Sequence, residues 1–428
     1  MSEHRIQNFD SLATTPVRTA ALQIAEAGLA AIDTAQIVSQ SISLSDNTLH
    51  VKDQTFDISL FKRIRVIGFG KASCDAAFAL EKILGSNIKD GIVIGLETAQ
   101  CEVIETYAGS HPRPSSQNVA ISKKIFDMSE TSVETDLVIA IISGGGSALL
   151  CWPEDECAQG QELYDKFLST GGTIQELNLV RKHISYLKGG GLAKALYPAT
   201  VVGLIFSDVP GNHYDQVASG PTYKDVSTIA DAEKIIRDRG LGEFKLIETP
   251  KEDKYFEKVH NIVLVSNETA LEAMASKARE LGLAPHIISS EMYDAPKEAV
   301  EDLVKESASR GKSSVILAAG EPILEVKKHG GSGGRCSYMA LEAIDKLPAE
   351  SAAIFLASDG IDNSLSAGAI VDTDSLRRST DRGLNAPEAK ENFDSGTFFQ
   401  NLGDLIMTGP TGANVSDLMC VVVGPITT

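Results

Sequence analysis

A repeated order of apolar strand, polar or glycine-rich tip and helix most constrains the fold of this 428-residue chain. Apolar runs at residues 64–67, 137–142 and 199–206 each end in such a tip. The order stops in a charged, proline-containing stretch at 244–260 and resumes at 261–265. Alternation of this kind predicts sheets that are largely parallel and covered by helices.

The interruption predicts two domains of the α/β class. We expect an N-terminal domain at 1–243, a linker at 244–260 and a smaller C-terminal domain at 261–428. Residues 1–60 are expected to be mainly helical, because apolar side chains between Val17 and Ile32 recur at helical spacing.

The stretch that follows residue 176 combines an expected helix with a polar strand end. The helix should run from 177 to about 188 and end at three glycines. Its polar face carries, at 3-4-3 spacing, Asn178, Arg181, Ser185 and Lys188. Two cations beside an amide and a hydroxyl suit an anion, although a solvated helix face would give the same pattern. Asp208 then follows a buried strand, where open α/β sheets place their chemistry and where turns also favour aspartate.

Three glycine-rich tips are candidate anion sites. Gly68-Phe69-Gly70-Lys71 can hold a phosphate on backbone N–H groups, with Lys71 as a point charge. It is not a full dinucleotide fingerprint, since Ser73 stands where a third glycine is needed. Ser143 to Ser147, with Gly144, Gly145 and Gly146 between them, lets the backbone approach a ligand closely. The loop before Arg335, including Gly333 and Gly334, is typical of a phosphate loop at a helix start.

Further polar residues follow apolar strands, which is the arrangement of a cleft lined by strand ends. This set comprises Asn267, Glu321, Asp359 and a threonine-rich turn with Thr408 and Thr411. Asp359 and Asp362 flank Gly360 and could hold a divalent ion or accept a hydroxyl proton, but aspartates are also common in turns.

Charge and cysteine usage exclude several classes of function. A net charge of −19 argues against a general nucleic-acid binder and against binding to an anionic membrane. No apolar run is long enough for a transmembrane helix, and the first 20 residues hold no apolar signal core. Six scattered cysteines, without a metal-binding spacing, are typical of reduced thiols in a cytoplasm.

The ordered motifs resemble those of one family along nearly the whole chain. VIGFGKAS, SGGGSALL, LNLVRKHISYLKGGGLA, SDVPGNHYDQVASGPT, the GGR that ends at Arg335, DGID and TGPTGANVSDL are similar to the glycerate 2-kinases. Some members of that family are labelled hydroxypyruvate reductases. The sequence departs from the family pattern after Arg335, where Cys336-Ser337-Tyr338 replaces Asn-Gln-Glu, and at Asn212 and 363–366.

The resemblance implies a Rossmann-like N-terminal domain, a C-terminal MOFRL domain and a site in an interdomain cleft. It also implies phosphorylation of D-glycerate, or a close hydroxy acid, at the 2-hydroxyl with ATP and Mg²⁺. Lys71 and Arg335 would correspond to the catalytic cations, and Asp208 or Asp359 would hold the metal or orient the hydroxyl. The remaining candidates for substrate or phosphate binding are Gly70, Ser143, Gly144, Gly145, Gly146, Ser147, Arg181, Lys188, Asn267, Glu321, Gly333, Gly334 and Thr411.

Two other functions are considered beside the kinase. A nicotinamide-dependent hydroxypyruvate reductase would need the complete glycine fingerprint, which Ser73 interrupts. A non-catalytic sugar-acid binding protein would bind its ligand without ATP turnover. The residues alone do not decide which loop holds ATP and which holds the acceptor.

Overall fold

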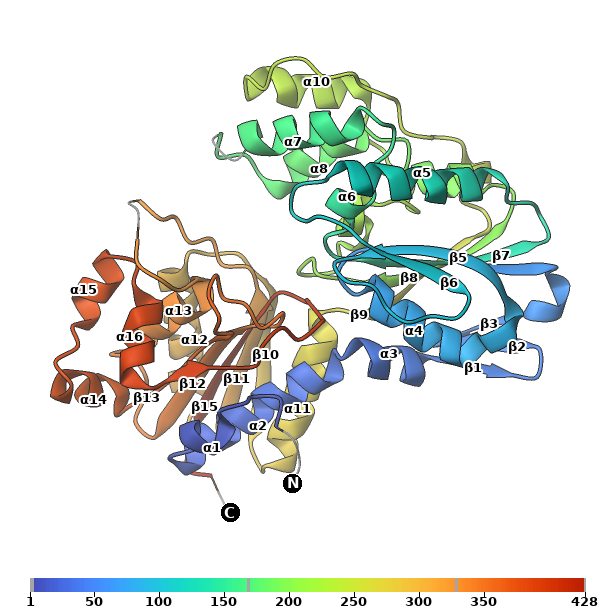
Figure 1. The fold of residues 1–428 in the computed structure, drawn as a ribbon. Coiled ribbons are helices and arrows are strands. Elements are labelled where there is room, and N and C mark those ends of the chain that lie inside the picture. Colours follow the sequence, from blue (N-terminus) through green and yellow to red (C-terminus); the bar gives the residue numbers. More distant parts are fainter. Residues whose placement is uncertain (1–3, 168–169, 328–329, 427–428) are drawn as a thin grey trace. The chain divides into compact units, whose positions relative to one another are not determined.

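The computed structural model describes residues 4–167, 170–327 and 330–426, and these form two compact units (Figure 1). The parallel-sheet unit comprises Thr34–Val209 and His213–Leu264. The mixed-sheet unit comprises Met1–Asp33, Pro210–Asn212 and Val265–Thr428. Each unit is described by itself. No helix among the described residues has both the length and the apolar character that crossing a membrane requires.

The parallel-sheet unit is built on six strands in the order β6-β5-β4-β7-β8-β9. The bounds are β4 Arg63–Phe69, β5 Ile88–Gly95, β6 Ile104–Ala108, β7 Asp136–Ser143, β8 Thr200–Phe206 and β9 Val259–Val265. All four pairings from β6 to β8 are parallel. Every residue of β7 is buried, which is expected for a central parallel strand covered on both faces.

Helices cover both faces of this sheet, with α4 and α5 on opposite sides of it (Figure 1). Ile121 and Ile125 of α5 share one apolar cluster with Ile67 and Phe69 of β4. The helices are α3 Thr34–Ser41, α4 Ser73–Leu84, α5 Ser116–Glu130, α6 Gly146–Leu149, α7 Glu156–Phe167, α8 Ile174–Lys182, α9 Gly191–Leu196 and α10 Ile229–Asp238.

The mixed-sheet unit has a second six-stranded sheet in the order β10-β11-β15-β12-β13-β14. The bounds are β10 Ala284–Met292, β11 Ser314–Gly320, β12 Ser351–Ala357, β13 Gly368–Asp372, β14 Leu405–Ile406 and β15 Asp417–Val423. Only β10 and β11 pair in parallel, and the other four pairings are antiparallel. The prediction of largely parallel sheets is therefore wrong for this unit, because β15, the last strand, inserts antiparallel between β11 and β12.

Successive residues of β15 face different helices, as the alternation of a strand requires. Met419 belongs to an apolar cluster with Met339 of α13, whereas Leu418 lies against Gly28 of α2. A Cβ at Gly28 would also come within 2.8 Å of Met274 of α11, so the glycine lets α2 and α11 pack closely. The helices are α1 Phe9–Leu12, α2 Pro16–Ala31, α11 Asn267–Glu280, α12 Pro296–Arg310, α13 Arg335–Ala343, α14 Ser375–Asp381, α15 Ala386–Glu391 and α16 Ser395–Leu402.

Residues 4–33 pack with the C-terminal half of the chain, which the predicted domain at 1–243 does not anticipate. Arg18 of α2, only 1% exposed, forms ion pairs with Asp372 and Asp404. At the other end, β9 joins the parallel sheet, although 261–265 was assigned to the C-terminal domain. Residues 1–60 are also less helical than predicted, because 42–57 form an antiparallel meander of β1 Ile42–Ser45, β2 Thr48–Val51 and β3 Gln54–Asp57.

Candidate active site

The strand order of the parallel sheet reverses between β4 and β7. From β4 the chain moves outward through β5 to β6, and it then returns to β7 on the other side of β4. Ligands of open α/β sheets bind at the carboxyl ends of strands at such a switch point. The two tips at this point are Gly70-Lys71 and 143–147, which are two of the loops that the sequence singles out.

The two tips hold each other through close backbone contact. Gly70 has a φ of +122°, and a Cβ on it would lie 2.2 Å from the Oγ of Ser143. The backbone N–H of Lys71 donates to the carbonyl of Gly144 at 2.8 Å. The Oγ of Ser143 accepts from the N–H of Ala72 at 3.1 Å. Ser143 therefore joins the end of β7 to the start of α4, and Gly70 is required sterically.

The glycines of the 143–147 loop leave room for side chains that converge on it. A Cβ on Gly144 would lie 2.0 Å from Oδ2 of Asp208, which places this carboxylate directly over the loop. A Cβ on Gly145, whose φ is +78°, would lie 3.1 Å from both Lys71 and His111. The N–H groups of Ala148 and Leu149 donate to the carbonyl of Gly145, whereas the N–H groups before them precede the first turn of α6 and have no acceptor within that helix. The loop thus combines a lysine, an aspartate and backbone donors.

A polar chain extends from this loop to Arg181. Ser147 and Ser219 lie 2.8 Å apart through their Oγ atoms, and Ser219 donates to Oδ1 of Asn178 at 3.4 Å. Arg181 donates to the same Oδ1 at 3.3 Å. Desolvation lowers the pKa of the partly buried Arg181 guanidinium to about 10, which leaves it protonated at neutral pH. Arg181 and Ser147, both predicted from sequence, therefore belong to one network.

His111 lies at this site, although the sequence did not indicate it as a candidate residue. Desolvation, followed by the positive charges of Lys71 and Arg181, lowers the pKa of this histidine to about 4. It therefore lies near both cations, three residues beyond the end of β6. His111 follows a strand, as the other candidate residues do, but the residues of 104–108 do not form an apolar run that predicts this strand from sequence.

Lys188 does not belong to the polar face that the sequence predicts. Helix α8 ends at Lys182, not near residue 188, so the 3-4-3 spacing does not continue. The Nζ of Lys188 donates to the carbonyl of Leu150 at 2.6 Å and to the carboxylate of Glu156. Since Lys188 is 1% exposed, its charge is neutralised inside the fold, and we assign it a structural role.

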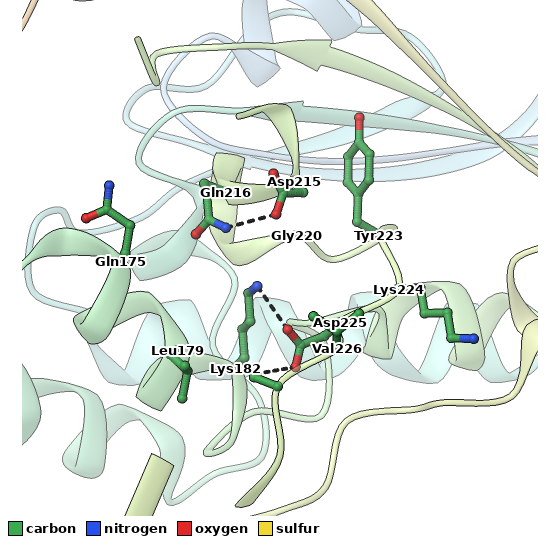
Figure 2. A pocket seen from close by; sticks show the side chains of 11 residues that line it. Gln175, Leu179, Lys182, Asp215, Gln216, Gly220, Tyr223, Lys224, Asp225 and Val226 are labelled. Carbon is green, nitrogen blue, oxygen red and sulfur yellow. Dashed lines mark hydrogen bonds and ion pairs between the residues drawn. The ribbon is translucent and has the colours of Figure 1, made fainter. Parts of the chain in front are cut away.

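Another face of α8 lines a separate cavity of about 230 Å³ (Figure 2). Lys182 and Asp225 point toward each other there, with Nζ and Oδ1 3.1 Å apart. Asp225 also accepts from Ser227 and Thr249. The charge of Lys182 is therefore satisfied within the protein, in contrast to that of its neighbour Arg181.

In the mixed-sheet unit, Arg335 is paired with internal carboxylates. Its Nε donates to Asp417 at 2.8 Å, and its NH1 lies 3.7 Å from Glu321. Burial raises the pKa of Asp417 to about 7 even though Arg335 lies beside it. The predicted residues Arg335 and Glu321 thus lie together, and Asp417 is a third member that the sequence did not indicate.

The loop at Gly333 and Gly334 is not an open phosphate cradle. Asp362 accepts from the backbone N–H groups of Gly334, Cys336 and Ser337 at 2.8–3.1 Å and from the Ser337 hydroxyl at 2.6 Å. A protein carboxylate thus occupies the start of α13, where the sequence suggested a bound phosphate. The sequence does not predict this contact, because Asp362 lies 28 residues from Gly334 and local spacing does not reveal such a distant partner.

The remaining predicted residues of this unit take part in local contacts. Asn267 is 1% exposed and donates to Ser290, so it anchors the start of α11. The hydroxyl of Thr411 donates to the carbonyl of Ser358 at 2.6 Å. Asp359 accepts from the N–H of Ile361 at 3.0 Å, as in a turn. Across the described ranges, no three His, Cys, Asp or Glu side chains gather as a metal site would require.

A parallel sheet with cations, glycines and a carboxylate at its switch point is an arrangement in which α/β proteins bind small anionic ligands. Comparisons with known proteins identify the family within this class. The domain of unknown function DUF4147 matches residues 20–249, and the MOFRL family matches residues 314–417. The chain belongs to the glycerate 2-kinase family, and this confirms the resemblance seen in the sequence.

The similar proteins cover nearly the whole chain. The glycerate 2-kinase of Pyrococcus horikoshii is 32% identical, over 95% of this chain and 97% of its own. A putative hydroxypyruvate reductase of Agrobacterium vitis is 35% identical, over 85% and 87%. The crystal structure of a glycerate kinase from Thermotoga maritima has a TM-score of 0.83 at 28% identity, covering 95% of this chain and 99% of that one.

Proposed function

We propose that this protein transfers the γ-phosphoryl group of ATP to the 2-hydroxyl of D-glycerate. Its membership in the glycerate 2-kinase family supports the reaction class. The observation that carries the proposal is the cluster at the switch point, where Lys71 lies against one glycine loop and Arg181 is joined to that loop through hydrogen-bonded polar side chains. Both the donor and the acceptor of this reaction are anions, so a site with two cations and backbone donors suits them.

The residues of the parallel-sheet unit would divide the work of phosphoryl transfer. Lys71 would neutralise charge on the transferred group, and the glycine loop would orient it. Asp208 would hold or orient the acceptor hydroxyl, or serve as a ligand of Mg²⁺. Since Mg²⁺ keeps several waters and binds nucleotide phosphates, a single carboxylate fits as its protein ligand. When bound, the ion would supply further charge neutralisation.

Arg335 remains a proposed catalytic cation of the mixed-sheet unit. Its guanidinium is 37% exposed while Asp417 anchors one edge of it, so the side chain is held and still partly accessible. This combination suits an arginine that stabilises phosphoryl charge. We also propose a cytoplasmic location and a small-molecule hydroxy acid, rather than a nucleic acid, as the partner.

The test is a coupled assay of ADP production over a panel of small hydroxy acids, with and without Mg²⁺. We expect ADP release stimulated by D-glycerate, with 2-phosphoglycerate as the product. Oxidation of NADH on hydroxypyruvate is measured in parallel, because it tests the reductase alternative. Clear NADH turnover without ADP release on any acid would refute the kinase.

A further inference from the structure

Arg181 carries a positive charge that none of the described carboxylates neutralises through an ion pair. Within residues 4–167, 170–327 and 330–426, its polar contacts are the neutral amide of Asn178 and the face of the Tyr164 ring, whose centroid lies 5.9 Å away. The nearest acidic influence comes from Glu156, which is already paired with Lys188. A desolvated cation without a counter-charge lowers stability, so its presence requires a compensating function.

A second arginine on the same aromatic ring shows the difference. The guanidinium of Arg113 lies 5.8 Å from the centroid of Tyr164, but it also donates to Asp165 at 2.7 Å. Arg113 is exposed as well, with 59% of its side chain accessible. Tyr164 thus lies beside two arginines. Arg113 is paired with a carboxylate, whereas the more buried Arg181 has no carboxylate partner among the described residues.

The surroundings of Arg181 favour a carboxylate of a small ligand. A guanidinium binds a carboxylate through two parallel hydrogen bonds. The Ser147–Ser219 pair and Asn178 supply neutral hydroxyl and amide groups next to it, and Ser147 connects them to the glycine loop. Lys71 reaches the same loop at Gly145, two residues before Ser147.

We propose that Arg181, supported by Asn178, Ser219 and Ser147, is the subsite for the carboxylate of the acceptor. The phosphoryl group is then left to Lys71. This assignment rests on the proposed function, and it makes Arg181 the residue that selects hydroxy acids over neutral alcohols. The acceptor is then a hydroxy acid, whose carboxylate binds Arg181 while its hydroxyl receives the phosphoryl group.

The first test compares Arg181→Met with the matched control Arg113→Met. For Arg181→Met we expect KM for D-glycerate to rise about 10- to 100-fold, the typical loss for hydrogen bonds to a charged group. The kcat at saturation should change little, because the contact is made in both the ground and transition states. Arg113→Met should leave both constants within about two-fold. Equal KM values in the two variants would overturn the proposal.

Neutral acceptors give the specificity readout. The methyl ester of D-glycerate lacks the negative charge, so the wild type should prefer the acid strongly and Arg181→Met should lose most of that preference. Arg181→Lys should fall between them, since an ammonium cannot make the paired contact. An unchanged acid-to-ester ratio in Arg181→Met would contradict the assignment.

Asn178→Asp offers an isosteric test that keeps the arginine. The new carboxylate lies 3.3 Å from the guanidinium and acts as an internal competitor. We expect a raised KM together with a raised melting temperature. Arg181→Met should likewise keep or raise the melting temperature, whereas an arginine with only a structural role would lower it.

Direct binding separates this proposal from the proposed function. Binding of D-glycerate without nucleotide is followed by calorimetry in the wild type, Arg181→Met and Arg113→Met. Loss of binding in Arg181→Met alone supports the subsite even if no ATP turnover is found, in which case only the kinase fails. Turnover with D-glycerate but equal binding in all three proteins removes the subsite and leaves the kinase.

Discussion

The 143–147 loop of the parallel-sheet unit and the 330–334 loop of the mixed-sheet unit have similar sequences but opposite electrostatics. Both are glycine-rich and precede a helix. At the first, Lys71 lies against the loop, and Arg181, which has no acidic partner among the described residues, is linked to it through polar side chains. At the second, Asp362 occupies the N-terminus of α13, and Asp417 binds the adjacent Arg335.

The difference shows that a glycine-rich loop at a helix start predicts a bound anion, but it does not predict whether that anion is a carboxylate of the protein or a ligand. In the mixed-sheet unit the anion is a protein carboxylate that orders the loop. In the parallel-sheet unit, none of the described carboxylates pairs with Arg181, whose hydrogen bond goes to the neutral amide of Asn178. The cations of the first loop should therefore matter for binding and catalysis, whereas the charges of the second should also matter for stability.

The largest expected effect is on turnover. Lys71→Met and Arg335→Met should each lower kcat by roughly 10³-fold, as the loss of a cation that stabilises phosphoryl charge does. The Lys71 variant should keep its melting temperature within about 2 °C. The measurement is kcat at saturating ATP and D-glycerate beside a thermal melt. Near-normal kcat in either variant would remove that residue from the mechanism.

The next effect distinguishes Arg335 from Lys71. Arg335→Met leaves Asp417 buried and unpaired, so the free energy of unfolding should fall by about 2 kcal/mol, a value reduced because Arg335 is partly exposed.

The protonation of Asp417 decides how the stability loss of Arg335→Met depends on pH. Burial raises the pKa of this carboxyl to about 7, so its stabilising protonated form is lost as pH rises through that value. The deficit of Arg335→Met should thus grow above pH 7, and adding Asp417→Asn should relieve it. Denaturant titrations at pH 5 and pH 8 check this, and a constant deficit would show that Asp417 is not responsible.

A smaller effect is expected from removing the internal anion. Asp362→Ala should lower the free energy of unfolding by about 1–2 kcal/mol, because three backbone donors at the start of α13 lose their acceptor. Asp381→Ala is the control, since this exposed residue pairs with Arg377 on the surface and its loss should change stability by less than about 0.5 kcal/mol. Equal losses would mean that Asp362 is not an effective cap.

The smallest effect concerns His111. Its pKa is lowered to about 4, below the ordinary value of 6.5, so the stability it contributes is complete above pH 6.5 and is lost as pH falls through 4. His111→Gln should therefore lose less stability than the wild type between pH 7 and pH 4. Part of the His111 side chain is open to solvent, which weakens the desolvation that lowers its pKa, so we expect only a modest difference between denaturation midpoints. Parallel pH profiles would mean that neither desolvation nor the charges of Lys71 and Arg181 lower the pKa of His111.

Local sequence patterns predicted much of the parallel-sheet unit. Apolar runs located β4, β7 and β8, and the residues after them include Lys71, Ser143 and Asp208, which the structure brings to one loop. The same rules failed where partners are distant in sequence. Arg18 lies 354 residues from its partner Asp372, and no local period reports such a pair.

The sequence by itself determined the α/β class, the glycine tips and the family, because these depend on short-range periodicity and on motifs read in order. Only the tertiary structure decided that β15 inserts antiparallel, that α2 joins the C-terminal half, and which cations are already neutralised. The sequence places Arg181 and Lys188 on one polar face, with Lys182 between them. In the structure, Lys188 and Lys182 are paired with the carboxylates of Glu156 and Asp225, 32 and 43 residues away, whereas Arg181 has no acidic partner among the described residues. Electrostatic neutralisation acts through space over a few ångströms, and the folded chain sets those distances.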